Sequence, residues 1–507
     1  MSGSEISAYF VAHSHKPGDT AKLCISADCG LVDVKIVRQG SIDLCVEEHQ
    51  RVPVEFQPVP DAVVSEGCGW QTTLELEVGS AWTSGFYLAE IRASGRLEAP
   101  PALAFFVLRP AQRTADIVLC LTTSTWEAYN DFGGANAYSS GSDSYSAGAP
   151  QVSRHRPMAA GILRKPNDAV RIANVETQGE DVPWLAYAVS KGLSIWSGGT
   201  GWWNWEWPFV RWAEAQGYTL DYICSDDLDR DPSCLEGYSA YLSVGHDEYW
   251  SWEMRDTVEI FARSGGNVIF LSGNTAFWQV RWNEERTQMT TYKSRFRNDP
   301  VYKSEDPSRT TGLWSNPVTG RPENSMTGLS FTRAGYARMA GCSPKGLGGY
   351  IVERPEHWVF EGTGLRYGDV LGRKDVIIGY EVDGCAYRLV EGRPVPTGED
   401  GTPDATVILG TAPAALMNRD NAPPGFYPED AMTDQEVVAD QLLGSTDAAA
   451  LQAFKHGRAC LIVEDRANGG FLFNSGATDW TCGLAGEDPD VDRITRTVLD
   501  RALARCA

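Results

Sequence analysis

The sequence predicts a multidomain protein of the α/β plus β class, with a β-rich N-terminal domain ahead of a larger α/β domain. Two observations lead to this prediction. Short β-prone runs separated by turn residues fill residues 6–110, and strand-like and helix-like segments alternate after Pro110. A chain of 507 residues is long enough for roughly two to four domains. We place the first domain at residues 1–111 and the second at residues 112–507.

The N-terminal domain is expected to be an immunoglobulin-like β-sandwich. Apolar and polar residues alternate with a period of two, and turn residues separate the runs at the spacing typical of such sandwiches. No chemically active side chains cluster here, so the expected role is support or contact between subunits. The clearest strand candidates are residues 21–25, 32–37, 86–91 and 103–108.

The second domain is expected to hold a parallel sheet, because buried strand-like runs alternate with helix-like segments. Its predicted strands are residues 117–121, 219–224, 240–244, 268–271 and 471–473. Its predicted helices are residues 206–216, 252–264 and 490–504, the second of them capped by Ser251. Residues 300–457, rich in Gly, Pro and short β-like runs such as 375–380, are interpreted as a β-rich insertion with long loops.

Composition narrows the possible partners. Lys and Arg total 44 against 67 Asp and Glu, for a formal net charge of −23. This charge argues against nucleic acid and against anionic membrane surfaces. No apolar run is long enough to span a bilayer, and the first residues lack the features of a signal peptide, so we expect a cytoplasmic protein. The 12 scattered cysteines favour free thiols.

The most informative segment is Gly245–Trp250, which places His246 and Glu248 directly after a predicted strand. Tyr129 and Asn274 follow two other predicted strands. Because the carboxyl ends of parallel strands meet at one edge of a sheet, we expect these side chains to converge. Phenol, imidazole, carboxylate and amide groups together suit hydrolytic or metal-assisted chemistry.

Each of these residues also has a purely structural interpretation. His246 alone fits a buried, hydrogen-bonded core histidine, and Glu248 alone fits a first-turn carboxylate favoured by the helix dipole. Asp226 and Asp227, after another predicted strand, fit a solvated turn and helix start. Convergence on one edge is what favours a site.

Six motifs together resemble a known family. They are residues 125–134, 205–212, 243–250, 272–275, 292–294 and 379–383, reading TWEAYNDFGG, WEWPFVRW, SVGHDEYW, SGNT, YKS and GYEVD. Their residues and order are similar to those of the large (β) subunit of N,N-dimethylformamidase and its homologues, over most of the chain. The resemblance implies a three-layer α/β/α domain of the class I glutamine amidotransferase-like or flavodoxin-like kind.

The resemblance further implies a hydrolase of amide C–N bonds with a single ferric iron held by tyrosine phenolates and a glutamate. Tyr129 and Glu248 match the metal ligands, and the second tyrosine is left open between Tyr138 and Tyr145. Four further residues match other parts of the family's site. They are His246 beside the metal, Asn274 as a substrate-orienting amide, Lys293 as a pocket cation and Glu381 as a carboxylate near the reacting water.

We therefore expect an amidohydrolase that acts on a small amide or formamide. It is expected to form a homo-oligomer, and a small partner subunit is left open. The alternative is a catalytically degenerate or metal-free binding or accessory module on the same fold. A third hypothesis, carbohydrate binding, rests on the 17 tryptophans and the β domain.

Overall fold

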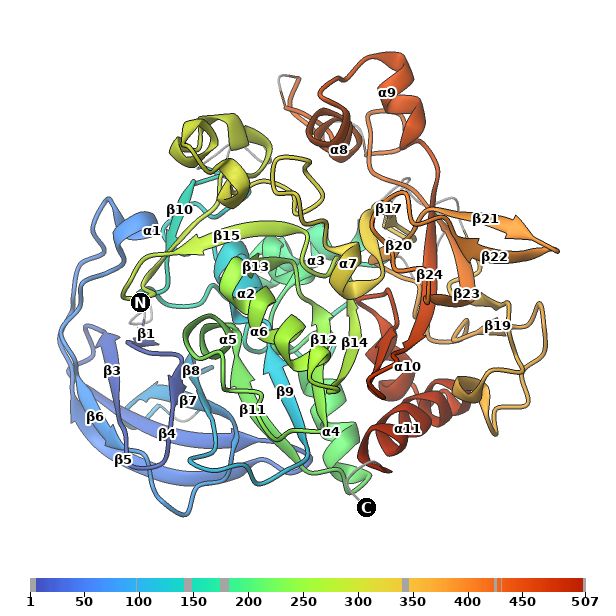
Figure 1. Ribbon diagram of the computed structural model, residues 1–507. Coiled ribbons are helices and arrows are strands. Elements are labelled where there is room, and N and C mark those ends of the chain that lie inside the picture. The colour runs from blue at the N-terminus through green and yellow to red at the C-terminus, as the bar shows by residue number, and fades with distance from the viewer. Residues whose placement is uncertain are drawn as a thin grey trace.

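The computed structural model describes residues 6–504 except 97, 141–147, 174–181, 340–345, 424–425 and 430 (Figure 1). The chain begins with a β-domain, drawn in blue, and continues into a large mixed α/β body. No helix among the described residues is both long enough and apolar enough to cross a membrane. The cysteines within the described ranges are all free, as the sequence predicts.

Two sheets form the N-terminal domain around a core of their own. In strand β4, alternate residues such as Val32, Val34 and Ile36 are buried, so one face of the sheet packs inward. The immunoglobulin-like topology stays a prediction. The three-stranded sheet has the order β1 (Ser7–Phe10), β3 (Thr20–Ser26), β6 (Leu74–Glu77). The five-stranded sheet has the order β2 (Ser14–His15), β8 (Ala102–Leu108), β7 (Gly85–Ala93), β4 (Leu31–Gln39), β5 (Leu44–Pro53), and helix α1 (Val63–Glu66) follows β5 in the chain.

A nine-stranded sheet organises the rest of the molecule. Its first five strands are mutually parallel and almost wholly buried, as expected for parallel strands covered on both faces. They are, in order, β11 (Leu220–Cys224), β9 (Ile117–Leu121), β12 (Ala240–His246), β14 (Asn267–Gly273) and β25 (Phe471–Asn474). Antiparallel strands continue the sheet, namely β24 (Gly457–Asp465), β23 (Val407–Ala414), β18 (Tyr350–Val352) and β19 (Val370–Leu371).

Helices cover both faces of this sheet. Successive residues of a strand point to opposite faces, and each face packs against its own helices. On one face Val118 and Tyr241 pack in the same cluster as Val258. On the other, Leu119 and Leu242 share a cluster with Phe209, Trp480 and Val498. The first face carries α5 (Ser225–Arg230) and α6 (Trp252–Arg263), and the second carries α4 (Glu206–Ala215), α10 (Trp480–Ala485) and α11 (Pro489–Leu503).

Region 300–457 contributes to the main sheet as well as forming loops, since β18, β19 and β23 belong to it. The strand-like run at 375–380 is not a strand. Its backbone makes turn and loop hydrogen bonds instead, such as that from the N–H of Ile377 to the carbonyl of Gly372 at 3.3 Å, and Arg171 donates to the carbonyls of Asp375 and Val376. The region also contains α7 (Asn324–Thr327), β17 (Ser330–Tyr336) paired with β20 (Glu381–Gly384), the hairpin β21 (Tyr387–Val390) and β22 (Arg393–Pro396), α8 (Asp434–Leu443) and α9 (Ala448–Ala453).

A four-stranded sheet and short helices complete the body. The sheet has the order β10 (Gln151–Ser153), β16 (Gln288–Thr290), β15 (Trp278–Trp282), β13 (Tyr249–Ser251). The remaining helices are α2 (Thr123–Tyr129) and α3 (Pro183–Lys191), with the 3-10 helices η1 (Ile195–Gly199), η2 (Lys293–Asn298), η3 (Pro300–Lys303), η4 (Pro307–Arg309) and η6 (Trp358–Phe360).

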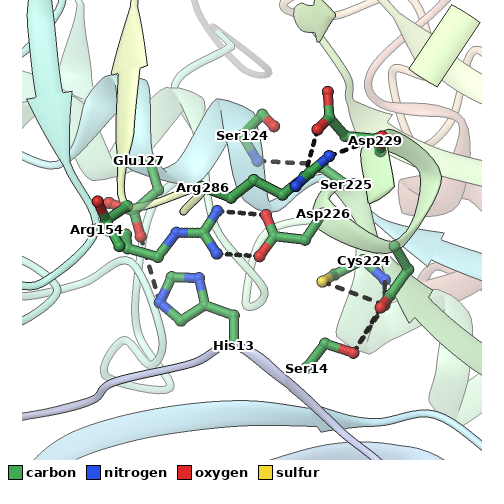
Figure 2. A network of polar contacts seen from close by, with 12 residues as sticks. His13, Ser14, Ser124, Glu127, Arg154, Cys224, Ser225, Asp226, Asp229 and Arg286 are labelled. Atoms are coloured by element: carbon green, nitrogen blue, oxygen red, sulfur yellow. Dashed lines mark hydrogen bonds and ion pairs between the residues drawn. The ribbon is translucent and has the colours of Figure 1, made fainter. Parts of the chain in front are cut away.

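Buried polar contacts join the β-domain to the α/β body (Figure 2). Ser14 of the β-domain donates to Asp227 at 2.8 Å. Beside it, within the α/β body, Arg154 forms a two-pronged ion pair with Asp226. Nε2 of His13 lies 3.5 Å from Oε1 of Glu127 in α2. Burial raises the pKa of Asp226, but the Arg154 guanidinium outweighs it, and the pKa lies below its usual value. The predicted helix start at Asp226 and Asp227 is confirmed by α5, but the solvated turn is wrong, because both carboxylates are buried against Arg154 and Ser14.

Candidate active site

His246 is held through both nitrogens of its ring. It is the last residue of β12 and 1% exposed. Nδ1 lies 2.6 Å from the carbonyl oxygen of Gly199, so it carries a proton and donates to it. Nε2 lies 2.7 Å from Oε2 of Glu381 and 3.5 Å from Oε2 of Glu248. Burial opposes protonation, but the Glu381 and Glu248 carboxylates outweigh it and raise the pKa of His246 to about 9.

Two phenols lie beside Glu248. Tyr129, the last residue of α2, has its hydroxyl 3.2 Å from that of Tyr138, and the Tyr138 hydroxyl donates to Oε1 of Glu248. The backbone N–H of Glu248 donates to Oγ1 of Thr125 at 2.9 Å, which holds the backbone of Glu248 against α2. Burial, and next the Glu248 charge, raise the pKa of Tyr129 well above its usual value. Tyr145 lies outside the described residues.

Asn274 follows β14 and reaches the same carboxylate as His246. Its Nδ2 donates to Oε2 of Glu381 at 3.1 Å, which leaves Oδ1 as a buried acceptor with no hydrogen-bond partner within the described part of the chain. Its backbone has a φ of 51°, a strained value for a residue with a side chain. Asp383 compensates, because its carboxylate accepts from the backbone N–H groups of Asn274 (2.9 Å) and Thr275 (3.1 Å).

Lys293 is buried against aromatic rings rather than paired with a carboxylate at hydrogen-bond distance. Its side chain is 7% exposed, and Nζ lies 2.7 Å from the centre of the Tyr138 ring and 5.1 Å from that of Trp278. No hydrogen-bond partner for Nζ occurs among the residues that the structure describes. Burial lowers the pKa of Lys293 well below its usual value, against the opposing charge of Glu248.

A cavity of about 60 Å³ opens onto Tyr138 and Lys293. Its lining also includes Phe277, Trp278 and Asp434 of α8. Burial raises the pKa of Asp434 to about 7. The cavity thus reaches Tyr138 and Lys293 of the site.

The sequence-predicted residues of this cluster lie together, with Tyr138 as the described candidate for the second tyrosine. The sequence missed Gly199, Thr125, Asp383 and Asp434. Asp383 stands two residues after Glu381 in the same motif, which is the signal that points to it. Asn474 follows the predicted strand 471–473 but does not join the site. Its Nδ2 donates to the carbonyl of Thr327, and its Oδ1 accepts from the N–H of Gly476.

The aromatic run 202–209 has divided roles. Trp205 lies at the site, with its ring 6.2 Å from that of His246 and its Nε1 donating to Asp479 at 3.0 Å. Trp202 packs on Phe86 of the β-domain at 4.1 Å. Part of the run therefore walls the site and part belongs to the domain interface.

The site places an imidazole between two carboxylates, next to two phenols and an amide. It lies at the end of a parallel sheet, so the protein is of the α/β class with a buried acid/base site. The chain belongs to the N,N-dimethylformamidase beta subunit-like family, because the model of that family's C-terminal part matches residues 36–493. This confirms the resemblance seen in the motifs.

Two curated relatives are similar along most of the chain. The N,N-dimethylformamidase beta subunit of Alcaligenes sp is 24% identical over 481 residues, covering 86% of this chain and 54% of its own length. That of Paracoccus aminophilus is 23% identical over 475 residues, with the same coverage. The chain thus spans about half the length of these relatives.

Proposed function

We propose that this protein hydrolyses the C–N bond of a small amide or formamide at the site around His246, with the help of a single ferric ion. Membership of the family supports a hydrolase. The observation that carries the proposal is the position of His246, whose Nε2 faces Glu381 at 2.7 Å while Nδ1 is fixed by Gly199. An imidazole so held can pass a proton between water and a leaving amine.

The residues fit the proposed ion. The oxygens of Tyr129, Tyr138 and Glu248 form a contiguous set of phenol and carboxylate donors. Oε2 of Glu248 is buried and has no hydrogen-bond partner in the described portion of the chain. Such hard oxygen donors suit Fe³⁺. When bound, the ion would act as a Lewis acid that polarises the amide carbonyl and acidifies water.

The cavity supports a small substrate. One ordered water needs roughly 10–15 Å³ of such a cavity. The volume of about 60 Å³ therefore holds about four to six water-sized groups. A formamide with a few heavy atoms fits this space. Nζ of Lys293, which lines the cavity, has unused hydrogen-bonding capacity that suits the carbonyl oxygen of an amide. Oδ1 of Asn274, beside Glu381, has unused capacity that suits an amide N–H.

The proton transfers follow from the same geometry. Glu381 takes a proton from water as the water oxygen adds to the carbonyl carbon, and Lys293 donates to the oxygen that becomes negative. Imidazolium His246 then gives its Nε2 proton to the amide nitrogen, the C–N bond breaks, and the amine leaves. Glu381 returns its proton to His246 across the 2.7 Å contact, so that the products are a carboxylic acid and an amine.

The relatives are named beta subunits, which supports a partner subunit of another kind, and we propose assembly into an oligomer. A degenerate or metal-free binding module would be favoured if the second tyrosine ligand were missing. Tyr138 beside Glu248 is a candidate for that ligand and so supports the hydrolase over the binding module. Six tryptophans are fully buried core side chains, so the high tryptophan content does not favour carbohydrate binding.

The test measures amine release from a series of formamides, acetamides and benzamides by the purified chain, with and without added ferric iron. We expect release from small amides that depends on iron and is lost in Glu381→Gln. Absence of release by iron-loaded protein, alone and with its partner subunit, contradicts the proposal.

A further inference from the structure

A glycine-rich turn of residues 195–201 lies against the site. The carbonyl of Gly199 accepts from Nδ1 of His246 at 2.6 Å. A Cβ on Gly199 would lie 2.9 Å from the Tyr380 hydroxyl and 3.3 Å from the Tyr129 ring, and one on Gly198 would lie 2.4 Å from the Trp184 ring. Backbone therefore fills the space beside the site, and the place of the Gly199 carbonyl decides the place of the imidazole.

Asn204 holds this turn on both sides of Gly199. Its Nδ2 donates to the carbonyl oxygens of Ser197 at 3.0 Å, Gly198 at 3.1 Å and Thr200 at 2.7 Å. The intervening carbonyl, that of Gly199, points to His246. One amide group thus shares its two hydrogens among three carbonyls and leaves the fourth for the ring.

Lys165 fixes the orientation of the Asn204 amide. Its Nζ is bonded to Oδ1 of Asn204 and to the Ser197 carbonyl at 2.7 Å, and lies 4.6 Å from the centre of the Trp184 ring. Because an amine bound there donates, Asn204 must present Oδ1 to the lysine and Nδ2 to the turn. Lys165 is 5% exposed, and burial lowers its pKa to about 7.

We propose that Lys165 and Asn204 are positioning residues for His246. Lys165 orients the side-chain amide of Asn204, and Asn204 holds the turn of residues 195–201 in place. The Gly199 carbonyl of that turn then fixes the position of the His246 ring. The effect on turnover rests on the proposed function, whereas the effect on the ring does not.

The decisive variant is Asn204→Asp. Its carboxylate still accepts from Lys165 but has no N–H to offer the three carbonyls, so the turn loses its clamp while the lysine keeps a partner. We expect kcat to fall roughly 10- to 100-fold with little change in KM, as is typical when a residue that orients a reacting group is lost. If Asn204 served only to satisfy Lys165, the variant would keep full turnover.

A second measurement follows the Nδ1–H proton of His246 by nuclear magnetic resonance. In protein labelled with ¹⁵N-histidine and freed of metal by a chelator, the Nδ1–H proton of His246 is assigned by its absence in His246→Asn. We expect it to exchange slowly in the natural protein and at least roughly tenfold faster, at a shifted position, in Asn204→Asp.

Asn267→Asp is the matched control. Asn267 is also buried, donates to the Ser239 carbonyl at 2.9 Å and accepts from the N–H of Phe471 at 3.2 Å, but it stands at the opposite end of β14 from the site. The His246 signal and kcat are expected to be unchanged in it.

An unchanged His246 signal in Asn204→Asp overturns the inference, whatever happens to kcat. If the natural protein releases no amine, the proposed function fails, but the signal still decides the positioning role. Should Asn204→Asp not fold, Lys165→Met replaces it, because its apolar chain can remain beside Trp184. The same change in the His246 signal is then expected, and its absence is equally decisive.

Discussion

Nε2 of His246 lies 2.7 Å from Oε2 of Glu381, although the two residues come from different sheets. His246 ends a strand of the nine-stranded sheet, and Glu381 begins β20, which pairs only with β17 among the described strands. The contact lets one buried proton move between a base and an acid without crossing water. Glu381 is therefore the first residue to substitute in a test of the proposed proton transfer.

Glu381→Gln is expected to lower kcat by roughly 10²- to 10⁴-fold, the usual contribution of a general acid–base group. The amide keeps the shape of the side chain but cannot take a proton from water. Steady-state release of amine measures the effect. Glu399→Gln, at an exposed position, is the control and should retain full activity. Equal rates for the two variants would exclude Glu381 as the base.

Tyr138→Phe tests the second phenol ligand. Ferric iron bound by phenolate gives a visible charge-transfer colour, and the variant loses one of two phenols, so we expect weaker absorbance and less bound iron per chain. Tyr367→Phe, at a residue 62% exposed, is the matched control and should look like the natural protein. Undiminished colour and iron content in Tyr138→Phe would assign the second ligand elsewhere, with Tyr145 as the next residue to change.

The buried ion pair between Arg154 and Asp226, inside the α/β body, is open to a stability test. Removing one partner of a buried ion pair leaves an uncompensated charge and costs about 3–5 kcal/mol. We expect a loss of this size in the free energy of unfolding for Asp226→Asn, which strands Arg154. Glu75→Gln, in the exposed pair with Lys22, should cost less than about 1 kcal/mol. Urea unfolding followed by circular dichroism compares the two, and equal losses would contradict a buried pair.

The sequence predicts the strands and helices of the parallel half of the sheet well, because their apolar runs are long and bounded by caps. Strand β9 at 117–121 and helix α6 at 252–263 stand where the pattern places them. The antiparallel half is harder to predict. Strands β18 and β23 pair with residues far along the chain, and nothing in a short run such as 350–352 indicates its partner.

The candidate site shows the same division. His246, Glu248 and Asn274 follow predicted strands, so the geometry of a parallel sheet already brings them together. Glu381 and Lys293 come from outside that rule, and only the resemblance points to them. The Gly199 carbonyl and the Asn204 clamp depend on backbone position, which side-chain patterns do not encode.

Glu206 offers a pH test away from the proposed ligands. It is 1% exposed, and its Oε1 accepts from Thr122 at 2.9 Å and from the Trp126 indole at 3.2 Å. Burial raises the pKa of Glu206 to about 8, against an ordinary value of 4.5, so the folded state holds this proton over a range in which the unfolded state has lost it.

This difference in pKa between the folded and unfolded states decides how the free energy of unfolding changes with pH. The stability that the Glu206 proton contributes is complete below pH 4.5 and is lost as the pH rises through about 8. One proton corresponds to a fall of about 1.4 kcal/mol per pH unit within that window. Glu206→Gln keeps a neutral side chain at every pH, so its free energy of unfolding should fall less steeply than that of the natural protein. Urea unfolding of both proteins at pH 5, 6, 7 and 8 measures the two slopes, and parallel slopes would mean that Glu206 is already ionised in the folded chain.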